Sequence, residues 1–309
     1  MKNDYINKKQ FENDLLNYTA LLKEFNKKKL HIILISLSFF ISFLLYSALL
    51  PNIYSSKSIL VPVESESKNS SVLQGYSGLA SLAGINISDN ISSKSAEATE
   101  KLKSFDFFSK NILNEIFLPN LVAVSKWDSV TNKIIYKQDV YDYENGLWTR
   151  KVEYPFNSKP SEQEAFEYFK EIFSLTVDSD TSLLTLEIKH PSPNIAKKWN
   201  DLIIAEINRE YREVDKIKAS SSIEYLLGQI SSTNYAEIKQ VLSQLIQNET
   251  QKLMLVEINE EYVFKILDSP VAPEEKSSPS RVLISIFGLF MGLFISFAYI
   301  IFRFAINNR

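Results

Sequence analysis

The chain has 309 residues, of which 45% are hydrophobic and 23% charged, and its formal net charge is −3. It contains no cysteine, so it forms no disulfide and gives no indication of a redox compartment. Two uncharged apolar runs, residues 32–50 and 282–302, lie near the two ends. Helices of these lengths span roughly 29 and 31 Å and match a hydrocarbon core of about 30 Å. This layout excludes most classes of soluble enzyme.

The distribution of charge predicts how the chain crosses the membrane. Residues 1–31 carry seven basic and four acidic side chains, and residues 303–309 carry two basic and no acidic ones. Residues 51–280 carry 24 basic against 33 acidic side chains. Because basic residues favour the cytoplasmic side, we expect both termini in the cytoplasm and the middle outside it. A cleaved signal peptide is the alternative for the first run, but no small-residue cleavage site follows it.

The first half of the middle segment mixes strand, loop and helix patterns. Residues 53–63 are rich in β-branched side chains and predict a strand, and residues 64–95 predict a loop rich in Ser, Asn and Gly. Apolar residues at helical spacing then predict one helix that ends before Pro119. Residues 121–160 are aromatic and irregular.

A clear helix start follows at Ser161, whose side chain can cap the backbone N–H of Glu164 while Glu164 reaches back. Two strands, residues 173–177 and 183–189, come next. Ser192 and Pro193 then suit the start of a long helical region.

The long helical region carries a narrow apolar stripe. The stripe begins with Trp199, Ile203, Ile207, Val214 and Ile217. Residues 231–233 interrupt the pattern, and Asn234 with Glu237 offers a new cap. Such a stripe is typical of helix-on-helix packing, so we expect an extended arm that packs against copies of itself. A helical hairpin folded onto its own domain is the alternative.

A last strand at residues 261–267 leads through Pro270, Pro273 and Pro279, an extended linker, into the second span. We expect this strand to share a sheet with the first. The predicted fold is an α+β domain with a membrane-proximal sheet and a long extended helical arm, flanked by two transmembrane helices. The expected segments are a tail (1–30), a span (31–50), a base domain (51–191), the arm (192–260), the return strand and linker (261–280), a span (281–302) and a tail (303–309).

The sequence offers little catalytic chemistry. It has two histidines, His31 and His190, no His/Cys cluster for a metal and no Gly-rich phosphate loop. Ser161 and Glu164 fit a capping box better than a catalytic pair. We therefore expect no catalytic, cofactor or metal site and no nucleic-acid partner. In the second span, Ser285, Gly288, Gly292 and Ser296 share one face, which predicts close packing against the first span, a second copy or another membrane protein.

Several runs in a fixed order resemble the Wzz-type chain-length determinants, the polysaccharide co-polymerases of bacterial inner membranes. They are residues 78–85, 148–150, 160–161, 190–193, Ala196, 199–200, 207–210, 222–226 and 261–270, with 273–274 and 279–281 before the second span. The resemblance implies a periplasmic α/β base with a rising helix, a homo-oligomer in the inner membrane and no enzymatic activity. It further implies a role in setting the modal length of a surface glycan, usually lipopolysaccharide O-antigen. The protein would act on a membrane-embedded polymerase, with the growing glycan or its lipid carrier as a further partner.

Three other functions remain open at this point. The first is the membrane module of a capsule or exopolysaccharide export system partnered by a separate cytoplasmic tyrosine kinase. A periplasmic sensor receptor shares the two-span layout, but residues 303–309 supply no output domain. A membrane-anchored glycan enzyme would need a converging carboxylate pair.

Overall fold

The computed structural model describes residues 25–63 and 87–307. The described chain divides into two compact units. One comprises residues 53–276, and the other joins residues 1–52 to residues 277–309. Most of the predicted N-terminal tail, residues 64–86 of the loop expected at 64–95, and the last two residues lie outside the described part.

Four strands of the larger unit form one antiparallel sheet among the described residues. Their order is β6 (Phe173–Val177), β7 (Leu184–His190), β1 (Tyr54–Pro62) and β8 (Phe264–Asp268). The first and last strands of the chain therefore pair, as the sequence predicted, although β8 begins three residues later than the expected strand. In this way the chain leaves and returns through adjacent strands of one sheet.

Alternation along the strands gives the sheet one buried face. On β7, Leu184, Leu186 and Ile188 are buried, and opposite them on β1 lie Leu60, Ser58 and Ser56. The intervening positions are half-buried, except Lys57 and Lys189, which are exposed. The buried face is the floor of the hydrophobic core.

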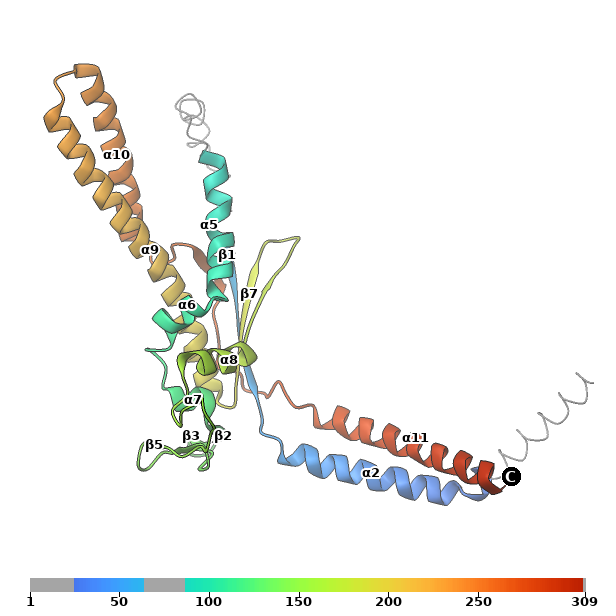
Figure 1. The fold of residues 1–309 in the computed structure, drawn as a ribbon. Helices are drawn as coiled ribbons and strands as arrows, with labels where there is room; N and C mark the ends of the chain where they lie inside the picture. Colours follow the sequence, from blue (N-terminus) through green and yellow to red (C-terminus); the bar gives the residue numbers. More distant parts are fainter. Residues whose placement is uncertain (1–24, 64–86, 308–309) are drawn as a thin grey trace, which may run out of the picture. The chain divides into compact units, whose positions relative to one another are not determined.

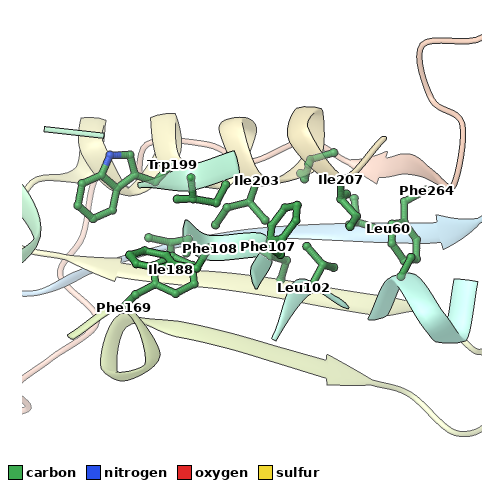
Figure 2. Close-up of a cluster of buried hydrophobic side chains, with 14 of the residues drawn as sticks. Leu60, Leu102, Phe107, Phe108, Phe169, Ile188, Trp199, Ile203, Ile207 and Phe264 are labelled. Carbon is green, nitrogen blue, oxygen red and sulfur yellow. The ribbon is translucent and has the colours of Figure 1, made fainter. Parts of the chain in front are cut away.

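Helices cover this face. They include α5 (Ile87–Leu102), α6 (Phe105–Phe107), the π-helix η1 (Phe108–Ile112), α8 (Glu162–Ile172) and the first half of α9 (Pro193–Ser232). Figure 2 shows Trp199, Ile203 and Ile207 projecting from α9 toward the strands, with Phe107 and Phe108 beside them. The core therefore joins the sheet to helices that lie between its first and last strands in the sequence.

Two predictions in the first half are wrong in detail. Residues 87–95, expected in the loop, belong to α5. The single helix expected to run to Pro119 is broken, because α5 ends at Leu102 and the Ser104 side chain caps α6 by accepting a hydrogen bond from the Phe107 N–H. A short helix, α7 (Leu118–Val122), then begins with Pro119 in its first turn, a position that tolerates a missing N–H.

The aromatic stretch at 121–160 contains two small hairpins in place of the irregular segment expected there. One pairs β2 (Val124–Asp128) with β3 (Lys133–Tyr136), and the other pairs β4 (Tyr141–Asp142) with β5 (Leu147–Trp148). Gly146 precedes β5 with a φ of 68°, a left-handed conformation that glycine adopts without strain.

The helical arm is a hairpin of two helices within the larger unit. Helix α9 has 40 residues, or about 60 Å at 1.5 Å per residue, and its second half packs against α10 (Ala236–Ile258). Figure 1 shows the two helices side by side, projecting away from the sheet. The break falls where the sequence predicted it. However, α10 begins after Tyr235, so Asn234 is not its cap.

The smaller unit is a pair of helices, α2 (Lys29–Leu49) and α11 (Arg281–Asn307). Among the described residues, these two helices are long and apolar enough to cross a membrane. They run antiparallel, since Phe25 contacts Phe297 at one end and Arg281 donates to Asn52 Oδ1 at the other (3.1 Å). The predicted combination of an α+β domain, a long helix and two candidate membrane helices is confirmed.

Candidate functional surfaces

The stripe predicted for the oligomer arm divides into two parts in the structure. Trp199, Ile203 and Ile207 are buried in the core of their own chain, whereas Val214 and Ile217 are exposed on the arm. The assignment of the first three to an interface between copies is therefore corrected. The boundary expected at residue 192 also moves, because the first half of α9 completes the base domain.

Two asparagines fix this first half of α9 to the sheet. The Asn208 side-chain oxygen accepts the backbone N–H groups of Tyr262 (3.0 Å), Val263 (2.8 Å) and Phe264 (3.0 Å). Its amide donates to the carbonyls of Ile204 and Phe264. One buried side chain thus satisfies the backbone at the start of β8.

Asn200 has the same role at the centre of the sheet. Its amide donates to the Ser56 carbonyl (3.0 Å) and the Leu186 carbonyl (3.3 Å), and its oxygen accepts from the Ser58 hydroxyl (2.8 Å). Neither asparagine was predicted from the sequence. The signal that could have identified them is two amides, about two helical turns apart, on the same apolar face of a helix. The contact with Asn200 satisfies the Ser58 hydroxyl under the helix, and the Ser56 hydroxyl is satisfied by the Val271 carbonyl.

The start of α9 depends on His190. The Ser192 N–H donates to His190 Nδ1 (2.9 Å), so Nε2 carries the proton and donates to the Asn120 carbonyl (2.9 Å). Burial lowers the pKa of His190 to about 4, because the charged ring would lose its hydration. Ser192 holds the predicted N-cap position, but its side chain makes no capping hydrogen bond. His190 is therefore a neutral structural group.

The arm half of α9 has a different environment. Between the two arm helices, Ala219 and Val256 are buried, and Lys216 forms an ion pair with Glu257 (2.7 Å). The outer faces expose large apolar side chains among the described residues. They are Val214, Ile217, Tyr225 and Leu227 on α9, and Ile238, Val241, Leu245, Met254, Leu255 and Ile258 on α10. The hairpin therefore buries only part of its apolar surface within one chain.

The four small residues of α11 face α2 of the same chain. Ser285 and Ser296 are buried and donate to backbone carbonyls one turn earlier, at Arg281 and Gly292. A Cβ added at Gly292 would lie 2.8 Å from the Ser36 Cα, and one at Gly288 would lie 2.6 Å from the Phe43 Cβ. Close approach of the two helices therefore requires glycine at these positions.

The linker prolines lie in an extended segment after β8. Pro270 is buried, while Pro273 and Pro279 are half-buried. The Ser56 hydroxyl donates to the Val271 carbonyl (2.8 Å), which holds the first part of this segment against β1. The prolines thus accompany a chain segment that is anchored to the sheet at its beginning.

Ser161 and Glu164 form the predicted capping box. Arg150 adds a bidentate pair with Glu164 (2.9 Å for both bonds) and donates to the carbonyls of Asn157 and Ser158. The Arg150 guanidinium lowers the pKa of Glu164 below its usual range. Ser161 and Glu164 therefore have structural roles. Within residues 25–63 and 87–307, no group of three His, Cys, Asp or Glu side chains could hold a metal ion.

Comparison with known proteins supports one family. Residues 14–115 match the family model described as "Wzz: Chain length determinant protein", in agreement with the resemblance seen in that third of the sequence. No curated protein matches the chain.

Two solved structures are similar at low identity. A full-length bacterial polysaccharide co-polymerase has a TM-score of 0.39 and 11% identity, covering 93% of this chain and 97% of its own. A fragment of WzzB, a polysaccharide co-polymerase from Salmonella Typhimurium, has a TM-score of 0.32 and 13% identity, covering 74% of this chain and 100% of its own.

Proposed function

We propose that this chain is a Wzz-type chain length determinant, a non-enzymatic regulator that sets the modal length of a surface polysaccharide, in particular lipopolysaccharide O-antigen. It acts as a homo-oligomeric scaffold on the polymerase in the same membrane. Residues 31–50 and 281–302 cross the inner membrane, residues 51–280 are periplasmic, and the flanking tails are cytoplasmic. The acidic middle and basic flanks support this orientation.

The exposed apolar faces of the arm carry the proposal. Val214 and Ile217 lie on α9, and Ile238, Val241 and Leu245 lie at three- and four-residue spacing on α10. Apolar stripes at this spacing bind other helices, so each arm offers two surfaces to neighbouring copies. Two different surfaces that bind each other generate a ring if the rotation closes. Such a ring could hold the growing glycan or its lipid carrier near the polymerase.

The polymerase contacts the spans on surfaces other than the small-residue face. Phe43 and Ser36 of the same chain already pack against Gly288 and Gly292. The outward faces of α11 carry large side chains, including Phe287, Phe290 and Phe294. These side chains supply the packing surface for a second membrane protein.

The direct test is the glycan ladder of a deletion strain complemented with this gene. We expect the deletion to give a ladder without a preferred length and complementation to restore a modal length. If O-antigen is unchanged but capsule or exopolysaccharide is lost, the protein instead belongs to an export system with a separate kinase. An unchanged ladder and unchanged capsule would contradict both functions.

The role of the arm is tested by charge substitution on its outer face. Val241→Glu places a carboxylate in the stripe, whereas Gln240→Glu places one on an adjacent exposed position. We expect Val241→Glu to reduce oligomer size in detergent, measured by light scattering, and to broaden the glycan ladder. Gln240→Glu should change neither. Equal behaviour of the two variants would contradict assembly through this stripe.

A further inference from the structure

Residues 117–156, here named the aromatic module, concentrate the aromatic side chains of the base domain. Eight of the 40 residues are aromatic, against 12% for the whole chain, and they include two of its three tryptophans. They are Phe117, Trp127, Tyr136, Tyr141, Tyr143, Trp148, Tyr154 and Phe156. The module consists of α7, the two small hairpins and the segment that follows them. None of the functions proposed above uses it.

Part of this aromatic set forms a small cluster of its own. Tyr141 is buried and contacts the rings of Phe117, Tyr136 and Trp148. Tyr143 stacks on Tyr136 with a centroid distance of 5.1 Å and an interplanar angle of 11°. The cluster gives the two hairpins a common support, so the exposed side chains around it are held in place.

The rest of the module exposes large apolar groups. Tyr154 is 97% exposed and Val130, at the tip of the β2–β3 hairpin, is 92% exposed. Phe117, Ile135, Tyr143, Leu147, Val152 and Phe156 are also exposed. Soluble surfaces seldom gather so many large apolar side chains in one short segment unless the surface binds something.

Hydrogen bonds fix the module to one end of the sheet. Tyr54, the first residue of β1, pairs with His190, and the His190 ring donates to the Asn120 carbonyl. The Asn120 side-chain oxygen in turn accepts from the Tyr136 hydroxyl (2.6 Å). The Trp127 ring also packs edge-on against the Tyr54 ring at 5.5 Å. The module therefore lies at the end where the chain arrives from the first span, while α9 carries the arm tip the other way (Figure 1).

Covalent geometry limits how far this end can lie from the membrane. Helix α2 ends at Leu49 and β1 begins at Tyr54. Five residue steps of an extended chain span at most roughly 18 Å, so Tyr54 stays within that distance of the end of the span. The interfacial layer of a bilayer is the region where Trp and Tyr rings are enriched, because they have an apolar body and a polar edge.

We infer that the aromatic module rests on the outer surface of the membrane, with Val130, Tyr143 and Tyr154 among the side chains that enter the lipid headgroup region. The inference depends on the proposed crossing of the two spans. Residues 117–156 carry five basic and five acidic side chains, so attraction to anionic lipid is not the main force. The main force is the insertion of aromatic and apolar side chains, so zwitterionic lipid is sufficient for binding.

The absence of cysteine makes this surface directly testable in the full chain. Single cysteines at Val130, at Tyr154 and, as a control on the arm tip, at Tyr235 (70% exposed) are labelled with a fluorophore. The proteins are placed in phosphatidylcholine nanodiscs that contain lipid with a headgroup nitroxide quencher. We expect labels at 130 and 154 to be quenched at least roughly twofold more than the label at 235, since interfacial residues lie at the headgroup level. Adding phosphatidylglycerol should change this little.

The outcomes separate this inference from the proposed function. Each cysteine variant is also tested for its glycan ladder, which shows whether it folds and functions. Quenching at 130 and 154 no greater than at 235, in variants with a normal ladder, overturns the lipid contact and leaves length regulation intact. Labels shielded from water but not quenched by lipid indicate a second copy instead, and shielding that needs added glycan indicates a glycan site. Either result overturns the inference.

Discussion

The two halves of α9 carry one apolar stripe but bury it differently. In the base half, Ile203 is fully buried against the sheet, and in the arm half, Ile217 is 64% exposed. Both halves keep helical spacing, with four residues between stripe positions in the base half and three between Val214 and Ile217 in the arm half. What differs is the opposite surface, a sheet in one case and a single helix, α10, in the other.

The comparison shows that periodicity identifies an apolar face and not its partner. The base half also carries Asn200 and Asn208, whose amides satisfy strand backbone, whereas the described arm half has no buried amide of this kind. A buried amide in an apolar stripe therefore marks the part of a helix that packs on a sheet. The described arm half lacks one, and its outer apolar side chains are exposed within one chain.

The largest expected effect comes from removing Asn208. Asn208→Ala leaves three backbone N–H groups at the start of β8 without an acceptor, and each buried unsatisfied group costs about 1–3 kcal/mol. We expect a loss of about 3–5 kcal/mol, measured by denaturation of the full chain in detergent. Asn248→Ala, on the exposed arm, is the control and should change stability by less than about 0.5 kcal/mol. Similar losses for the two would remove the distinction between the halves.

A matched pair of truncations tests the stripe itself. Ile203→Ala removes a fully buried side chain and should cost about 2–5 kcal/mol. Ile217→Ala should cost less than about 0.5 kcal/mol within one chain but should weaken the oligomer. Denaturation and light scattering on the same samples separate the two effects. A large stability loss for Ile217→Ala without any change in oligomer size would contradict the assignment.

Acid should weaken the base half before the arm. The folded-state pKa of His190, about 4, lies below the ordinary value of 6.5, so the unfolded chain binds more protons and stability falls as the pH falls from about 7 toward 4. The expected loss between pH 7 and pH 5 is about 2 kcal/mol. Hydrogen exchange at both pH values would localise it to the start of α9. His190→Gln can keep the donor to Asn120 and should flatten this dependence. A variant with the same slope would show that another group causes it.

The smallest effect concerns glycine. Gly228 lies in the exposed arm half of α9, and a Cβ there meets no described atom within 4 Å. Gly228→Ala should therefore stabilise the arm by about 0.5–1 kcal/mol through helix propensity. Gly292→Ala should instead destabilise the helix pair, because its Cβ would lie 2.8 Å from the Ser36 backbone. Thermal melting in detergent compares the signs, and stabilisation by both would contradict the packing of α2 on α11.

Local chemistry predicted many elements well. The capping box at Ser161 and Glu164, the strands flanking residues 178–183 and the pairing of β1 with β8 are confirmed. Predictions failed where short-range signals compete. Residues 87–95 carry only two apolar side chains, Ile87 and Ile91, yet α5 includes them, and its Ala98 and Leu102 are buried in the core. The small hairpins at 124–148 were missed because their strands are only two to five residues long.

The roles of individual residues were harder to predict from the sequence than the helices and strands. The small-residue face of the second span could be seen in the sequence, but three possible partners for it remained until the structure placed it against Ser36 and Phe43. The roles of Asn200, Asn208 and Arg150 depend on backbone groups about 7 to 144 residues away in sequence. No local pattern encodes such distances.

The sequence by itself determined two helices apolar enough to cross a membrane, the long helical region and the resemblance to a chain-length determinant, and it predicted an orientation for the two helices. These follow from composition and periodicity, which are local properties of the chain. Only the tertiary structure decided where the apolar stripe of α9 changes from core to exposed arm, and which surface the glycines of α11 face. Both depend on contacts between segments that are distant in the sequence. The free energy of burial depends on these contacts and not on the apolar pattern alone.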